Sequence, residues 1–255
     1  MSFEFTKENI DLYLRELAKE YRKQIGKAMP AELVLIGGAS ILINYGFRNM
    51  TTDVDAVIRG VSAMKDAINR VGERFDLPNG WLNADFMKTE SYTPKLAEHA
   101  KHYKTYSNVL SIYTVSAEYL IAMKLRSGRQ YKSDLSDVLG ILAEHEKNGA
   151  PISMERIQTA VTELYGAWDA LPETSRAFID NVMVNGRFTE LFAQVQRGEQ
   201  ETKALLTEFT KDYPDVLQQS NVNAIAGNLQ DKSDRASILR QLQTMRETEP
   251  EDPER

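Results

Sequence analysis

Two aspartates separated by one residue are the first candidates for chemistry in this sequence. Asp53 and Asp55 open the segment Asp-Val-Asp-Ala-Val-Ile, which predicts a strand over residues 53–58. Alternate residues of a strand project from the same face, so both carboxylates can hold one metal ion. Carboxylates are ligands that Mg²⁺ or Mn²⁺ prefers, and water and substrate phosphates complete the shell. The pair therefore predicts a divalent metal site.

A glycine pair upstream supplies a candidate phosphate-binding turn. Gly37 and Gly38 follow the apolar run 32–36, which predicts a buried strand, and residues 39–45 predict a short helix. Backbone N–H groups at a helix N-terminus attract anions, and glycine lets a phosphate approach the backbone closely. The hydroxyl of Ser40 adds a donor. These three residues are candidates for binding the phosphates of a triphosphate.

Each motif alone has an ordinary structural explanation. An Asp-x-Asp sequence is common at solvated strand ends, and a Gly-Gly pair after a strand is often only a turn. Here twelve residues separate Ser40 from Asp53, and the predicted order is strand, Gly-Gly, helix and Asp-x-Asp strand. This order places a phosphate cradle near a metal site and favours function.

Four cations lie within nine residues, in and after a helix predicted over residues 117–126. Lys124 stands well inside that apolar helix, so we favour a role in neutralising triphosphate charge, with Arg129 assisting. Arg126 and Lys132 are more typical of solvated helix ends, where cations complement the helix dipole.

Two further carboxylates follow, one helical turn apart. Asp134 and Asp137 lie at the edge of the apolar stripe of the next predicted helix. Asp134 in the first turn could simply complement the helix dipole. Asp137 lies one turn deeper, which favours it as the site residue.

Taken together, these segments resemble the signature of the polymerase-beta-type nucleotidyltransferase superfamily, Gly-Gly-Ala-Ser followed by Asp-Val-Asp. The run 122–137 is similar to that of the AbiEii-like nucleotidyltransferases, which include toxins of type IV toxin–antitoxin systems, and their bacterial relatives. That group has a helical lysine after the third strand, followed by an Arg/Lys-Asp-x-x-Asp element. Here Ser133 separates Lys132 from Asp134, so this part of the match is loose. The resemblance covers about residues 30–142.

The resemblance implies a fold, a reaction and a set of site residues. The fold would be α/β (α+β), with a small mixed sheet flanked by helices and then an all-helical domain. The reaction would move a nucleoside monophosphate from a triphosphate to an acceptor hydroxyl of RNA, protein or a small molecule. The implied partners are a nucleoside triphosphate and an antitoxin. The implied catalytic residues are Asp53, Asp55, Lys124 and Asp137, and the nucleotide-binding residues are Gly37, Gly38, Ser40, Lys124, Arg129 and Asp134.

One departure from the superfamily pattern concerns a third carboxylate. Many members carry it on a later strand, but the strand predicted over residues 109–114 offers none. The usual base for the attacking hydroxyl is therefore missing. A degenerate, non-catalytic nucleotide-binding module remains an alternative.

The elements that must position these residues follow from periodicity and turn signals. Apolar spacing predicts helices over 9–27 and 61–75, whereas residues 77–107 give no clear assignment, and Ser116 is a candidate helix cap. Beyond residue 150 the strand signal ends, which predicts a nucleotidyltransferase domain at 1–150 and a helical domain at 151–245. The helices expected there cover residues 153–167, 171–185, 187–197, 199–212 and 235–246. The acidic end, 246–255, is expected to be disordered.

Composition narrows the class further. The 255 residues include no cysteine, which excludes disulfides, zinc–thiolate sites and cysteine nucleophiles and fits a reducing cytoplasm. No apolar run approaches the length of a membrane span. A net charge of −6 disfavours nonspecific binding of nucleic acid, although a local basic patch could still bind RNA.

Overall fold

The computed structural model describes residues 3–129, 131–218 and 221–231. The chain divides into two compact units, each described here by itself. The first comprises Met1–Gly128 and Asp137–Phe192, and the second comprises Arg129–Ser136 and Ala193–Arg255. The sequence predicts domains at 1–150 and 151–245 as parts that fold independently. These limits stay a prediction.

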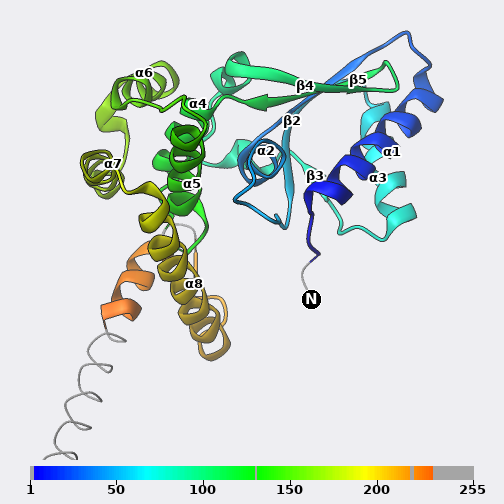
Figure 1. The fold of residues 1–255 in the computed structure, drawn as a ribbon. Coiled ribbons are helices and arrows are strands. Elements are labelled where there is room, and N and C mark those ends of the chain that lie inside the picture. The colour runs from blue at the N-terminus through cyan, green and yellow to red at the C-terminus, as the bar shows by residue number, and fades with distance from the viewer. Residues whose placement is uncertain (1–2, 130, 219–220, 232–255) are drawn as a thin grey trace, which may run out of the picture. The chain divides into compact units, whose positions relative to one another are not determined.

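A five-stranded mixed sheet organises the first unit (Figure 1). The strand order is β3-β2-β1-β5-β4. Strand β1 pairs antiparallel with β2 and parallel with β5, while β2 and β3 are parallel and β4 and β5 antiparallel. The strands are β1 (Ala31–Leu35), β2 (Val54–Arg59), β3 (Leu82–Asn83), β4 (Ala100–Tyr106) and β5 (Leu110–Val115). This mixed sheet with flanking helices confirms the predicted fold class.

Helices α1 (Lys7–Ile25) and α3 (Ala63–Phe75) contact each other and cover one face of the sheet (Figure 1). A capping box starts α1: the Thr6 hydroxyl accepts from Asn9 N, and the Asn9 side chain accepts from Thr6 N. The apolar stripe of α1 packs in a core with alternate residues of β1 and β2, among them Leu33, Leu35, Val54 and Ala56. Because these strand residues face the helices, their neighbours in β2 face away from this core.

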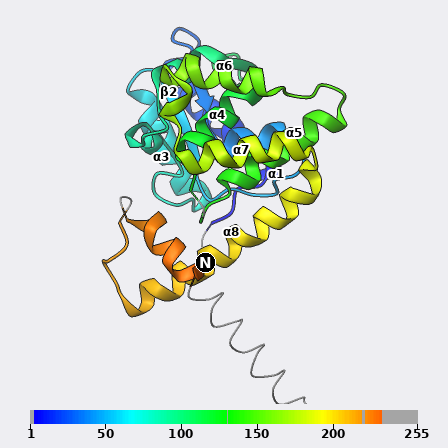
Figure 2. The same cartoon turned by 90° about the vertical axis from the view of Figure 1, so that its left-hand side faces the viewer.

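Helix α2 begins at the Gly-Gly turn, and the helices not yet described come later in the chain. Helix α4 contacts α6 and α7, and these helices appear together in Figure 2. Residues 222–231 are also helical. No helix in the described part of the chain is long and apolar enough to cross a membrane. The helices are α2 (Gly37–Asn44), η1 (Asp85–Lys88), η2 (Pro94–His99), α4 (Ala117–Ser127), α5 (Asp134–Lys147), α6 (Met154–Tyr165), η3 (Trp168–Ala170), α7 (Glu173–Asn185) and α8 (Phe188–Asp212).

Two local expectations from the sequence are wrong. Residues 187–197 and 199–212 form the single helix α8, because Gly198 lowers helix propensity without ending a helix that has packing to sustain it. Ser116 occupies the N-cap of α4, but its hydroxyl donates to the carbonyl of His99 instead of accepting from the helix. The expectations for residues 235–246 and 246–255 lie outside the described residues.

A buried carboxylate joins the two helices of the α1–α3 layer. Glu20 of α1 is 4% exposed and accepts hydrogen bonds from Arg74 at 2.9 Å and from Lys23 and Arg70 at 3.2 Å. Arg74, followed by Lys23 and Arg70, lowers the pKa of Glu20 from 4.5 to about 2. Ionised Glu20 therefore stabilises the folded chain above about pH 4.5, and this contribution is lost as the pH falls toward about 2.

The substitution Glu20→Gln tests this linkage. We expect the variant to melt at a lower temperature than the wild type at neutral pH, and the difference to shrink as the pH falls below 4.5 toward 2. Thermal unfolding followed by circular dichroism across this range measures it. Glu73→Gln, at an exposed position of α3, is the control. A difference that stays constant with pH would contradict the assignment.

Candidate active site

The two aspartates of the Asp-x-Asp motif lie at the start of β2. Asp53 directly precedes the strand and is exposed, whereas Asp55 is its second residue and is half-buried. Val54 and Ala56 are fully buried in the α1–α3 core. Asp53 and Asp55 therefore share the opposite face of the strand, which is the geometry that a common metal ion requires.

The turn after β1 brings the first glycine beside this pair. Backbone N–H of Ile36 donates to the carbonyl of Asp55 at 2.9 Å, which ties the turn to β2. Gly37 begins α2 and has a φ of +56°. A residue with a side chain would be strained in this conformation. A Cβ atom at Gly37 would lie 3.9 Å from Oδ2 of Asp55. The bare backbone of the turn thus adjoins a carboxylate of the candidate metal site.

Gly38 has no room for a side chain, because two neighbouring side chains lie against its backbone. A Cβ atom there would lie 2.6 Å from Oγ1 of Thr51 and 3.0 Å from Nη2 of Arg48. The glycine therefore admits these two side chains against the backbone of α2. Ser40, further along α2, is fully buried, and its Oγ has no hydrogen-bond partner among the described residues. The hydroxyl does not reach the surface of the turn in this structure.

This packing gives a stability prediction for Gly38→Ala. The added methyl group must displace Thr51 or Arg48, so we expect the free energy of unfolding to fall by about 1–3 kcal/mol. Urea denaturation measures it. Gly198→Ala is the matched control, because a Cβ in that helix meets nothing within 4 Å. It should raise stability by about 0.5–1 kcal/mol. Equal stability of Gly38→Ala and the wild type would show that the turn has room.

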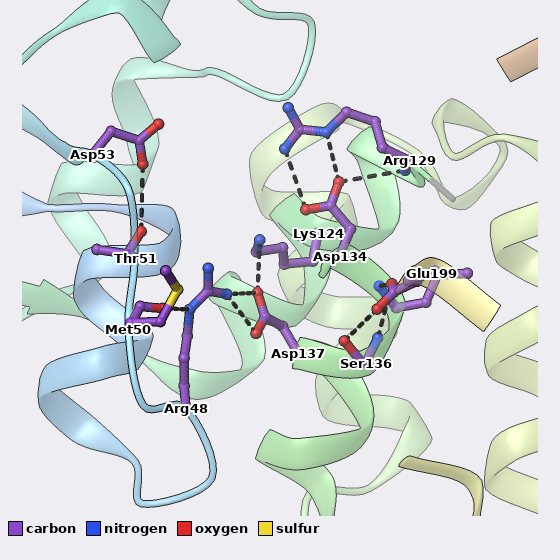
Figure 3. Close-up of polar contacts among 11 residues, drawn as sticks. Arg48, Met50, Thr51, Asp53, Lys124, Arg129, Asp134, Ser136, Asp137 and Glu199 are labelled. Carbon is purple, nitrogen blue, oxygen red and sulfur yellow. Dashed lines mark hydrogen bonds and ion pairs between the residues drawn. The ribbon is translucent and has the colours of Figure 1, made fainter. Parts of the chain in front are cut away.

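A buried ion cluster lies between α4, α5 and the loop before β2 (Figure 3). Nζ of Lys124 lies 2.8 Å from Oδ2 of Asp137. Nη1 of Arg48 lies 2.7 Å from Oδ1 and 2.5 Å from Oδ2 of the same carboxylate. Asp137 is 2% exposed and Lys124 is 6% exposed. One buried carboxylate therefore fixes two cations, which identifies Asp137 as a residue that orients Lys124 and Arg48.

Thr51 lies between the backbone of Gly38 and the first aspartate of the motif. Its hydroxyl donates to Oδ1 of Asp53 at 3.4 Å (Figure 3). The same side chain lies against the backbone of Gly38. Sequence reasoning missed both Thr51 and Arg48. One signal was present: Arg48 is the only charged residue between positions 39 and 52, directly upstream of the Asp-x-Asp motif.

Asp134 and Arg129 form a pair within the second unit (Figure 3). Asp134 is fully buried, and its carboxylate accepts from Nε of Arg129 at 2.7 Å and from Nη2 at 3.2 Å. Such a two-point pair is geometrically specific. Arg129 is thus a direct partner of Asp134, and the proposed nucleotide contacts of both residues stay a prediction.

A second carboxylate in that unit binds the start of α5. Glu199 of α8 accepts from backbone N–H of Leu135 at 2.9 Å and of Ser136 at 3.2 Å, and also from the Ser136 hydroxyl. These N–H groups have no partner within the helix, so Glu199 acts as a distant cap. No local pattern predicts this contact, which joins residues more than 60 positions apart.

The donor set suits a magnesium ion with an incomplete protein shell. Among the residues that the structure describes, no group of three or more histidines, cysteines or carboxylates could hold a metal. Mg²⁺ usually takes one or two carboxylates and completes its shell with water and substrate phosphates. Asp53 and Asp55 match that requirement. Strand β5 adds no carboxylate; Thr114, paired with Leu35 in β1, donates instead to Asn44.

The mixed sheet, with a Gly-Gly turn and an Asp-x-Asp strand at adjoining ends, is the architecture of a nucleotidyltransferase fold. Residues 13–164, more than half of the chain, match the model of a family described as "Nucleotidyltransferase of unknown function (DUF6036)". The chain belongs to this family. Searches of curated proteins and of solved structures found no match.

Proposed function

We propose that the protein is a metal-dependent nucleotidyltransferase that moves a nucleoside monophosphate from a triphosphate to an acceptor hydroxyl. One observation carries this proposal. The bare backbone of Gly37 lies beside the Asp55 carboxylate, with Asp53 on the same face of β2. A phosphate bound at the turn would lie next to a metal ion bound by the carboxylates.

The site residues would have distinct roles in this reaction. Asp53 and Asp55 would hold Mg²⁺ or Mn²⁺, which when bound supplies Lewis-acid stabilisation of the phosphoryl oxygens. Backbone N–H groups of the first turn of α2 would bind the β and γ phosphates. Lys124 would balance charge that develops on the phosphates, and Asp137 would keep Lys124 in place.

The acceptor oxygen forms a bond to the α-phosphorus, the bond from that phosphorus to the bridging oxygen breaks, and pyrophosphate leaves. The acceptor hydroxyl also loses its proton. Strands β4 and β5 carry no carboxylate to receive it. We propose that the proton passes to solvent.

A transfer assay tests the function. The purified chain is incubated with each α-labelled nucleoside triphosphate, Mg²⁺, and total cell RNA, protein or small-molecule extract, with a chelator as control. We expect label in one acceptor class only when metal is present. Metal-independent labelling, or no labelling of any acceptor, would contradict the proposal.

A second candidate is a non-catalytic nucleotide-binding module. The observation that favours it is the absence of a carboxylate from β4 and β5, which removes the usual base. This candidate predicts metal-dependent binding of triphosphate without release of pyrophosphate. Calorimetric binding combined with a pyrophosphate-release assay separates the two candidates.

The similarity of residues 122–137 to AbiEii-like enzymes supports a more specific proposal. The protein would act in the cytoplasm as a toxin, with RNA or protein as acceptor, and a cognate antitoxin would restrain it. Induced expression should arrest growth, and the double variant Asp53→Asn/Asp55→Asn should relieve the arrest. Co-expression of a small adjacent reading frame should also relieve it. Normal growth on expression of the wild type alone would contradict this role.

A further inference from the structure

One guanidinium nitrogen of Arg48 is not hydrogen-bonded by any residue that the structure describes. Its Nε donates to the carbonyl of Met50 at 3.1 Å, and its Nη1 binds both oxygens of Asp137 (Figure 3). The remaining nitrogen, Nη2, makes no hydrogen bond to the described residues. It lies instead against the Cα of Gly38, where an added Cβ would be 3.0 Å away.

The contacts of the other two nitrogens fix the plane of this group. Asp137 and the Met50 carbonyl hold the guanidinium at two edges, and the side chain is 18% exposed. A donor fixed in this way loses little conformational freedom when it binds a ligand. A guanidinium is also charged at every accessible pH and forms directed hydrogen bonds to phosphate oxygens.

Arg48 brings a positive charge to a turn that itself favours anions. Arg48 and Lys124 both contact Asp137. Nη2 of Arg48 lies beside the first turn of α2, whose backbone N–H groups attract anions. Arg48 thus lies next to the same turn that would bind phosphates in the proposed reaction.

We propose that Arg48 is a nucleotide-binding residue whose Nη2 donates to the terminal phosphates and selects triphosphates over ligands with a single phosphate. This inference rests on the proposed function, because it places the β and γ phosphates at the Gly37–Gly38 turn. The simpler alternative is that Arg48 only neutralises Asp137. The two differ in one respect: a purely structural Arg48 has no effect on polyphosphate affinity in a folded protein.

Calorimetry of the full chain with magnesium tripolyphosphate and with inorganic phosphate tests the proposal. Arg48→Gln should weaken tripolyphosphate binding by roughly 10- to 100-fold, the effect of one charge-assisted hydrogen bond, and change phosphate binding little. Arg59→Gln is the matched control, since Arg59 ends β2 and is half exposed beside Glu32. Tripolyphosphate affinity within about twofold of the wild type in folded Arg48→Gln would overturn the proposal.

Arginine footprinting of the wild type keeps the test decisive if Arg48→Gln does not fold. Tripolyphosphate should protect Arg48, but not Arg59, from modification by phenylglyoxal, read by mass spectrometry. Absence of protection would overturn the proposal.

The transfer assay then separates the two levels of inference. Nucleotide transfer with no effect of Arg48→Gln on polyphosphate binding would reject the role of Arg48 alone. Weakened polyphosphate binding without transfer to any acceptor would reject the proposed reaction and keep the binding site.

Discussion

Asp53→Asn and Asp55→Asn should each reduce nucleotide transfer by roughly 10³-fold, because a metal ion supplies several kcal/mol of transition-state stabilisation. The fold should survive both changes. Asp53 is exposed, Asp55 is half-buried, and the two like charges share one face of β2. Relief of their repulsion should leave the melting temperature in chelator unchanged or raised. Single-turnover transfer rates and thermal unfolding of the same preparations measure both effects.

Asp85→Asn is the control for charge alone. Asp85 follows β3, its side chain is 73% exposed, and its ion pair is with Lys88. Its removal should leave transfer unchanged. Transfer by the double variant Asp53→Asn/Asp55→Asn at the wild-type rate would remove the metal assignment, whatever the single variants show.

The central strands could be predicted because local signals and burial agree there. Residues of β1 are almost all buried, so the strand reads as a short apolar run closed by Gly37. Strand β2 alternates buried and partly exposed positions, so its pattern also gives the common face of Asp53 and Asp55. The site geometry at this end of the sheet thus follows from strand periodicity.

The edge strands could not be predicted because their sequences carry no such pattern. Residues 101–105 of β4 are exposed and polar or charged, and the strand is defined by its pairing with β5. Strand β3 has two residues and pairs only with the start of β2. In both cases the tertiary partner, and not the local sequence, determines the structure.

The ion cluster shows the same limit within the site. The positions of Lys124 and Asp137 in their helices, together with a family resemblance, predict both as site residues, but they do not predict the direct contact between them. Arg48 and Asp137 are 89 residues apart, and no periodicity relates a loop before β2 to the second turn of α5. The three side chains meet only through the tertiary structure of the first unit.

Lys124→Ala should reduce kcat/KM by roughly 10²–10³-fold, the loss seen when one preorganised electrostatic group is removed. Lys124 is buried, and Asp137 fixes its ammonium group at 2.8 Å. The charge stabilises the transition state more than the bound substrate. Its removal should therefore lower kcat more than it raises KM. Arg48 still contacts Asp137 in the variant, so the carboxylate keeps one cation and the chain should fold.

Two further variants separate this role from a general effect of charge. Lys124→Arg should restore activity only in part, because a planar guanidinium does not reproduce a compact ammonium group. Lys132→Ala removes an exposed cation eight positions later and should change kcat/KM little. Steady-state kinetics of the three variants, at temperatures below their melting points, provides the comparison. Equal and small effects at Lys124 and Lys132 would show that Lys124 serves only to pair Asp137 within the fold.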